Sequence, residues 1–119
     1  GDVLPPARIL GVHLEGPFLN PTMAGALDGS SFANASEAMF RDLTDGFEDL
    51  VRIVTIAPEK EDALGLIRFM VKRGILVNMG HSNATVAEAE AGFKAGARGV
   101  THLFNAMRAF STTLLDEAN

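Results

Sequence analysis

Apolar and polar positions follow one another along this chain in short blocks that predict strands and helices in turn. Largely apolar runs of strand length occupy Ala7–Leu14, Val51–Ala57, Ile75–Met79 and Arg98–Leu103. Continuous apolar runs are typical of strands buried on both faces of a parallel sheet. Between the runs, apolar residues recur every three or four positions, which is the period of an amphipathic helix. The order β-α-β-α-β-α-β favours parallel strands joined by right-handed crossovers.

Three helices are expected in the connections. For the first, Asn34 with Glu37 resembles a capping box. Its buried stripe is expected to contain Phe40, Leu43, Phe47 and Leu50. The segment that precedes this helix, 16–33, is long and polar, and such loops inside compact domains are usually functional.

The second helix is expected to start directly after Pro58 and to end at Gly74, a natural residue for the position after a helix. Its first turn would contain Glu59, Glu61 and Asp62, because the helix dipole favours acids there. Its buried stripe is expected to contain Leu64, Ile67, Met70 and Val71.

The third helix is predicted to start at a capping pair formed by Thr85 and Glu88 and to end at Gly96. Its apolar stripe is expected to contain Val86, Ala89 and Phe93.

This alternation begins both doubly wound sheets and (β/α)₈ barrels. The first strand–helix turn carries no glycine-rich dinucleotide fingerprint, which favours the barrel. A complete barrel takes ~250 residues, so the 119 residues of this chain correspond to about half of one. We therefore expect one α/β domain over 1–119, with 111–119 as a short helix or a frayed tail.

Composition narrows the possible partners. The net charge is -5, and the basic residues are scattered, so a nucleic-acid partner is not expected. The chain has no cysteine, so a metal would have to be held by His, Asp or Glu. No apolar run approaches the ~20 residues that cross a bilayer. We expect no membrane contact and a cytoplasmic location.

Ionisable side chains stand where the predicted strands end. These residues are Glu15, Glu59, His81 and His102. The carboxyl ends of parallel strands share one edge, where active sites lie. Glu15, His81 and His102 together would suit a catalytic zinc, which takes three protein ligands and keeps one open position. The alternative is that each histidine is a hydrogen-bonded structural residue, and for His13 a structural or supporting role is the better interpretation.

Three further residues or segments have two interpretations each. Gly80–Thr85 leads into a helix and could bind an anion with free N–H groups, although capping by Thr85 is the simpler account. Glu59 could be a general base or a first-turn acid favoured by the helix dipole. Asn105 could donate a hydrogen bond to a ligand or cap a loop.

Four motifs occur together and in order: HLEGPF at 13–18, TIAPE at 55–59, GHSNAT at 80–85 and THLFNAM at 101–107. With them the chain resembles the N-acetylglucosamine-6-phosphate deacetylases of the amidohydrolase superfamily. The resemblance implies strands three to six of a metal-dependent (β/α)₈ barrel. Its reaction would convert N-acetylglucosamine 6-phosphate and water to glucosamine 6-phosphate and acetate.

The resemblance also implies roles for single residues. Glu15, His81 and His102 match the ligands of the divalent metal ion, which is most often zinc. Asn105 and Ala106 match residues that hold the sugar phosphate. Substrate contact is also implied at Ala26, in a loop where the family usually has Lys-Gly-Ala/Thr-His; here Leu27 follows, and the histidine is absent.

The departures from the family pattern leave alternatives. An Arg-Glu-Pro-Gly stretch that the family commonly has after the Asn-Ala-Met run is absent here. The family's catalytic aspartate belongs to a later strand, so we expect this chain to be inactive alone. It could instead be a non-catalytic half-barrel that associates with itself, a homodimer being the simplest form. It could also come from a related amidohydrolase with another N-acyl substrate.

Overall fold

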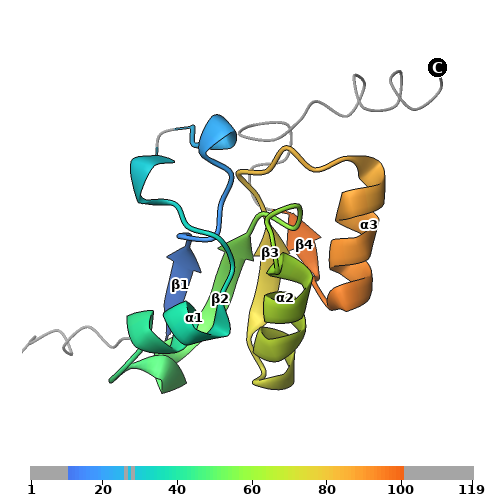
Figure 1. Cartoon of the computed structure of the whole chain (residues 1–119). Coiled ribbons are helices and arrows are strands. Elements are labelled where there is room, and N and C mark those ends of the chain that lie inside the picture. Colours follow the sequence, from blue (N-terminus) through green and yellow to red (C-terminus); the bar gives the residue numbers. More distant parts are fainter. Residues whose placement is uncertain (1–10, 26, 28, 101–119) are drawn as a thin grey trace, which may run out of the picture.

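A parallel sheet of four strands forms the centre of the molecule (Figure 1). The computed structural model describes residues 11–25, 27 and 29–100. The strands are β1 (Val12–Glu15), β2 (Val51–Ile56), β3 (Leu76–Met79) and β4 (Gly99–Val100), and they lie side by side in chain order. Each is parallel to the next. The predicted parallel α/β arrangement is confirmed.

The predicted strand positions are confirmed within a residue or two where the structure describes them. β1 continues to Glu15, one residue beyond the expected end. Its expected first residues, 7–10, lie outside the described part of the chain, as do 101–103 of the fourth strand and the expected tail at 111–119.

The helices α1 (Glu37–Leu43), α2 (Ala63–Lys72) and α3 (Val86–Ala95) connect successive strands. Short 3-10 helices occupy Pro21–Met23 (η1), Gly29–Ser31 (η2) and Glu48–Leu50 (η3). Right-handed crossovers between strands in sequential order place the helices on one face of a sheet, as Figure 1 shows. Loops, rather than helices, therefore surround the carboxyl ends of the strands.

The first helix differs from its prediction. Ser36, not Asn34, is the N-cap, and its side chain accepts a hydrogen bond from Met39 N. Glu37 is then the first helical residue and cannot close a capping box. The helix ends at Leu43, where Thr44 Oγ1 donates to the carbonyl of Phe40 at 2.8 Å.

The expected apolar stripe of this segment is wrong in part. Phe40 is buried, but Leu43 is 45% exposed. Phe47 and Leu50 lie beyond the end of α1, and Leu50 is 36% exposed in η3. A stripe of period 3.6 cannot continue here because the helix stops after seven residues.

The second helix begins at Ala63, several residues later than predicted. Glu59 and Glu61 therefore precede it rather than form its first turn. The residues that it buries are Ala63, Leu66, Ile67 and Met70. Val71, expected in this stripe, is 37% exposed. Gly74 has a φ of +81°, as the predicted helix-ending position requires.

The third helix begins as predicted, with a complete capping box between Thr85 and Glu88. Phe93, however, is 46% exposed. The residues that α3 buries are small, Gly92 and Ala95. A Cβ at Gly92 would collide with Met79 Sδ, so a larger residue here would force the Met79 side chain to move.

The core lies between the sheet and the helices. Val54, Ile56, Val77 and Met79 extend from the strands toward the buried side of α2. Alternate positions face the other way and include Ile53 and Leu76, which are register partners; Leu76 is 41% exposed. In the part of the chain that the structure describes, no helix combines the length and apolarity needed to cross a membrane.

Candidate metal site at the carboxyl ends of the strands

The structure brings together two of the three predicted metal ligands. Glu15 is the last residue of β1, and His81 lies two residues beyond the end of β3. Their side chains meet across the end of β2, with 2.5 Å between His81 Nε2 and Glu15 Oε1. The His81 side chain is 5% exposed and that of Glu15 is 30% exposed. A largely buried imidazole therefore faces a carboxylate that solvent can reach.

The other ring nitrogen of His81 defines the tautomer. Nδ1 lies 2.9 Å from the carbonyl oxygen of Met23. A carbonyl only accepts, so Nδ1 must carry a proton and donate it. Nε2 then faces Glu15 Oε1, and a contact this short needs either a proton or a metal ion between the two atoms. A histidine whose second nitrogen donates to a backbone carbonyl is the usual arrangement of a metal ligand.

The backbone of His81 is held in an uncommon conformation. Its φ is +46°, in the left-handed region, which costs a non-glycine residue about 1–2 kcal/mol. The 16–33 loop helps to hold it, since Asn20 N donates to the carbonyl of His81 at 3.0 Å. One residue earlier, Gly80 N donates to the carbonyl of Ile56 at 3.2 Å. Such strained residues cluster at functional sites, where the surrounding structure fixes them.

Glu59 contacts the segment that follows His81. Its Oε2 accepts from Ser82 Oγ at 2.5 Å, and its Oε1 accepts from Asn83 N at 3.3 Å. The expectation that Glu59 is an acid of the helix first turn is therefore wrong. It lies in the loop after β2 because the helix starts only at Ala63. Ser82 was not among the predicted site residues, and it is fully buried.

The environment of Glu59 disfavours its charged form. Burial raises the pKa of Glu59 above its ordinary value, and the hydrogen bonds from Ser82 and Asn83 offset only part of this effect. The nearby charge of Glu88 also raises it. A cleft of about 420 Å³ borders Glu59 and is lined as well by Lys60, Asp62 and Glu88.

His13 has the structural contact expected of it, because its Nε2 lies 2.8 Å from Thr55 Oγ1 on the neighbouring strand. The N-terminus of α3 likewise shows ordinary capping. Thr85 N donates to Glu88 Oε1, and Glu88 N donates to Thr85 Oγ1. These bonds use N–H groups that the anion-binding interpretation required.

The remaining predicted site residues, Ala26, His102, Asn105 and Ala106, lie outside the described residues. Across 11–25, 27 and 29–100, no group of three or more metal-binding side chains comes together. Leu27, in the loop where the expected histidine is absent from the sequence, donates its N–H to the carbonyl of Ala24 at 3.0 Å. The third ligand thus stays a prediction.

Fold and site together define a class: consecutive β/α units of the barrel type, with a carboxylate and an imidazole paired at the strand ends. No family model matches the sequence. It is 44% identical over 106 residues to the N-acetylglucosamine-6-phosphate deacetylase of Homo sapiens, covering 87% of this chain and 26% of that protein. It is also 39% identical over 103 residues to the N-acetylgalactosamine-6-phosphate deacetylase of Escherichia coli O157:H7, with 87% and 27% covered.

A solved structure agrees with these sequence matches. An N-acetyl-D-glucosamine-6-phosphate deacetylase mutant from Mycobacterium smegmatis, in complex with N-acetyl-D-glucosamine-6-phosphate, aligns with a TM-score of 0.80 and 40% identity. The alignment covers 83% of this chain and 26% of that one. Structures of this group have a (β/α)₈-barrel type of fold. The predicted resemblance is confirmed: the chain is similar to about a quarter of an N-acetylglucosamine-6-phosphate deacetylase.

Proposed function

We propose that this chain carries the metal-binding part of a deacetylase that acts on N-acetylhexosamine 6-phosphates. The observation that supports it most is the 2.5 Å contact between Glu15 and His81 at the carboxyl ends of β1 and β3. The similarity to N-acetylglucosamine- and N-acetylgalactosamine-6-phosphate deacetylases supplies the reaction.

The donor groups fit a divalent metal ion. A carboxylate oxygen and an imidazole nitrogen both suit zinc, and the Nδ1 proton of His81 is engaged by Met23, which leaves Nε2 as the donor. We propose His102 as the third ligand. When bound, the ion supplies Lewis acidity that polarises an amide carbonyl.

The protein groups would act by orientation and by exclusion of water. The carbonyl of Met23 fixes the His81 ring, and burial keeps that ring from turning into solvent. The 16–33 loop, from which Met23 comes, would border the sugar. Ala26, Asn105 and Ala106 are proposed to contact the substrate, and a charged sugar phosphate implies a cytoplasmic setting.

The substrate class is broader than the sequence motifs implied. The relatives act on two epimers, N-acetylglucosamine 6-phosphate and N-acetylgalactosamine 6-phosphate, at similar identity to this chain. The loop that contains Leu27 would border the sugar, and we propose that it sets the choice between the two epimers. We propose N-acetylglucosamine 6-phosphate as the substrate and its galacto epimer as the competitor to test.

Zinc binding tests the metal centre directly. The chain should bind one zinc ion in competition with a chromophoric chelator. Glu15→Gln and His81→Ala should each weaken binding by more than the ~10–100-fold that loss of an outer partner causes. His13→Ala is the matched control, since this histidine lies on the same strand as Glu15 but hydrogen-bonds to Thr55. Failure of the parent chain to bind zinc, or equal losses in the His13 and His81 variants, would contradict the proposal.

The reaction can be tested in a chimera. Residues 11–100 would replace the aligned segment of the Mycobacterium smegmatis enzyme, and acetate release would be followed with both sugar epimers. We expect activity with N-acetylglucosamine 6-phosphate that Glu15→Gln abolishes. A folded chimera that binds zinc but releases no acetate from either epimer would refute the reaction and leave the metal site standing.

The exposed sheet face supports a second candidate, a half-barrel that associates with itself. Leu76 is 41% exposed opposite the helices, and β1 and β4 are the outer strands of the described sheet. Unpaired strand edges promote pairing with a second copy. Light scattering on the purified chain separates the two ideas, since a monomer that binds zinc would rule out obligatory pairing.

A further inference from the structure

Glu59 joins two loops that lie beside the metal site. The Glu59 bridge consists of three hydrogen bonds. Ser82 Oγ donates to Glu59 Oε2 at 2.5 Å, Asn83 N donates to Glu59 Oε1 at 3.3 Å, and Ala84 N donates to Ser82 Oγ at 3.0 Å. The bridge therefore connects the loop after β2 to the three residues that follow His81.

These bonds act on the part of the chain where His81 needs support. His81 has the left-handed φ of +46°, and a residue in that region persists only when its neighbours fix it. On the preceding side, Gly80 N is bonded to Ile56. On the following side, the Glu59 bridge fixes Ser82 and Asn83. The backbone is thus fixed on both sides of His81, by Ile56 at the end of β2 and by Glu59 in the loop after it.

We propose that Glu59 is a positioning residue for His81. By fixing the backbone after His81, it keeps the ring nitrogen directed at Glu15 and at the metal ion. The effect of Glu59 on metal affinity rests on the proposed function, whereas its effect on the His81 ring does not. The ring orientation of His81 is a property of the chain alone.

The choice of a carboxylate at this position follows from its hydrogen-bonding capacity. An ionised carboxylate accepts at both oxygens, which suits one hydroxyl and one amide N–H as donors. A glutamine could accept from Asn83 N with its oxygen, but its NH₂ group would then face Ser82, whose hydroxyl would have to accept instead of donate.

The test compares four variants of the full chain. Glu59→Ala removes both bonds to the carboxylate, and Glu59→Gln removes the charge and reverses the direction of the bond to Ser82. Glu61→Ala changes an exposed acid of the same loop, and Ser36→Ala removes the cap of α1 far from the site and serves as a destabilised control. Zinc affinity is measured by chelator competition, and the ring protons of His81 by long-range ¹H–¹⁵N spectra without metal.

We expect Glu59→Ala to weaken zinc binding about 10-fold, at the lower end of outer-partner effects. Glu59→Gln should cause a smaller loss, and the two controls should bind as the parent does. The Nδ1–H signal of His81 should shift or broaden in both Glu59 variants and stay unchanged in Ser36→Ala. If Glu59→Ala fails to fold, the Glu59→Gln spectra and affinity decide in its place.

Two results would overturn the positioning role. One is an unchanged His81 spectrum in a folded Glu59 variant, and the other is parent-like zinc affinity in the same variant. If the parent chain binds no zinc, the proposed metal centre is refuted. The spectra of metal-free His81 still test whether Glu59 positions the ring. A double-mutant cycle with Ser82→Ala adds a check, since both changes break the same bond and their effects on affinity should not add.

Discussion

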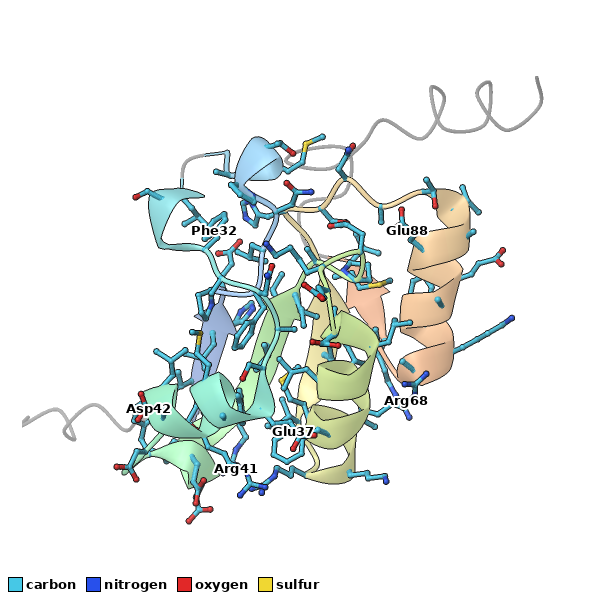
Figure 2. All side chains as sticks on the ribbon, viewed as in Figure 1. Phe32, Glu37, Arg41, Asp42, Arg68 and Glu88 are labelled. Carbon is cyan, nitrogen blue, oxygen red and sulfur yellow. The ribbon has the colours of Figure 1, made fainter. Side chains whose placement is uncertain are left out.

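The two ends of the sheet use polar residues in opposite ways. At the carboxyl ends, Glu15 bonds to His81 and Glu59 bonds to Ser82, so each contact joins two different loops or strands. At the amino ends, Arg73 and Arg41 lie over the ring of Phe69 at 4.4 and 5.2 Å. Figure 2 shows this end with Arg41 and Asp42 labelled, and Glu88 at the opposite end.

The difference separates stabilising contacts from site-forming ones. The arginines at the amino ends cover an apolar ring and keep their charge in water, which stabilises packing at little electrostatic cost. The acids and the histidine at the carboxyl ends are partly or fully buried, and His81 is strained. Stability alone does not require that arrangement, which supports the proposal that the site lies at the carboxyl ends.

The largest expected effect concerns the amino ends. Phe69→Ala removes a ring that packs edge-on against Phe40 at 5.9 Å and supports two arginines. We expect a loss of about 2–3 kcal/mol in the free energy of unfolding, below the range for fully buried rings because Phe69 is partly exposed. Urea denaturation measures it. Zinc affinity should not change in the folded variant. A large change would contradict the idea that the contacts at the amino ends serve stability alone.

An intermediate effect is expected at His81 itself. His81→Gly and His81→Ala remove the same ring contacts, but glycine adopts a φ of +46° without steric cost. The free energy of unfolding of the glycine variant should therefore be about 1 kcal/mol larger than that of the alanine variant. This holds despite the greater freedom of glycine in the unfolded chain. Equal stabilities would show that His81 is not strained. Both variants should fail to bind zinc.

The smallest expected effect is a pH dependence from Glu59. Because burial raises its pKa, the folded chain holds the Glu59 proton more tightly than the unfolded chain does. This contribution to stability is present below the unfolded pKa of 4.5 and is lost as the pH rises through the folded value. Glu88, Asp62 and Lys60 line the same cleft as Glu59.

Glu59→Gln should flatten the pH dependence of the unfolding free energy above pH 4.5. Glu61→Gln is the control, because this acid is exposed on the same loop. Urea denaturation at a series of pH values measures the slope. A slope that stays the same in Glu59→Gln would show that Glu59 does not titrate differently in the folded chain.

Most of the sheet and the pairing of Glu15 with His81 could be predicted from the sequence, because they depend on local patterns and on one general rule. Strand runs such as Val51–Ala57 and the Thr85–Glu88 capping pair depend on nearby residues, so local patterns suffice. The pairing of Glu15 with His81 follows from a general rule, since parallel strands bring their carboxyl ends to one edge. That rule needs no knowledge of side-chain packing.

The missed features depend on contacts that local patterns do not contain. Asn34 and Ser36 can both cap a helix, and only the folded chain selects Ser36. Glu59 and Ser82 are 23 residues apart in sequence, and no sequence pattern predicts the hydrogen bond between them. The strand-end rule placed Glu59 at the same edge as His81, but it did not identify Ser82 as its partner. The carbonyl of Met23 is a backbone atom and has no sequence signal.

The contact between Glu15 and His81 also has a mechanical consequence. It joins β1 to the segment after β3 and passes over β2, and two steps between neighbouring strands amount to roughly 10 Å. Side chains that bridge such a span hold β1 and the end of β3 at a fixed separation. The pair therefore links two strands that are not neighbours in the sheet. A mutation that removes either side chain changes the site and removes this link at the same time.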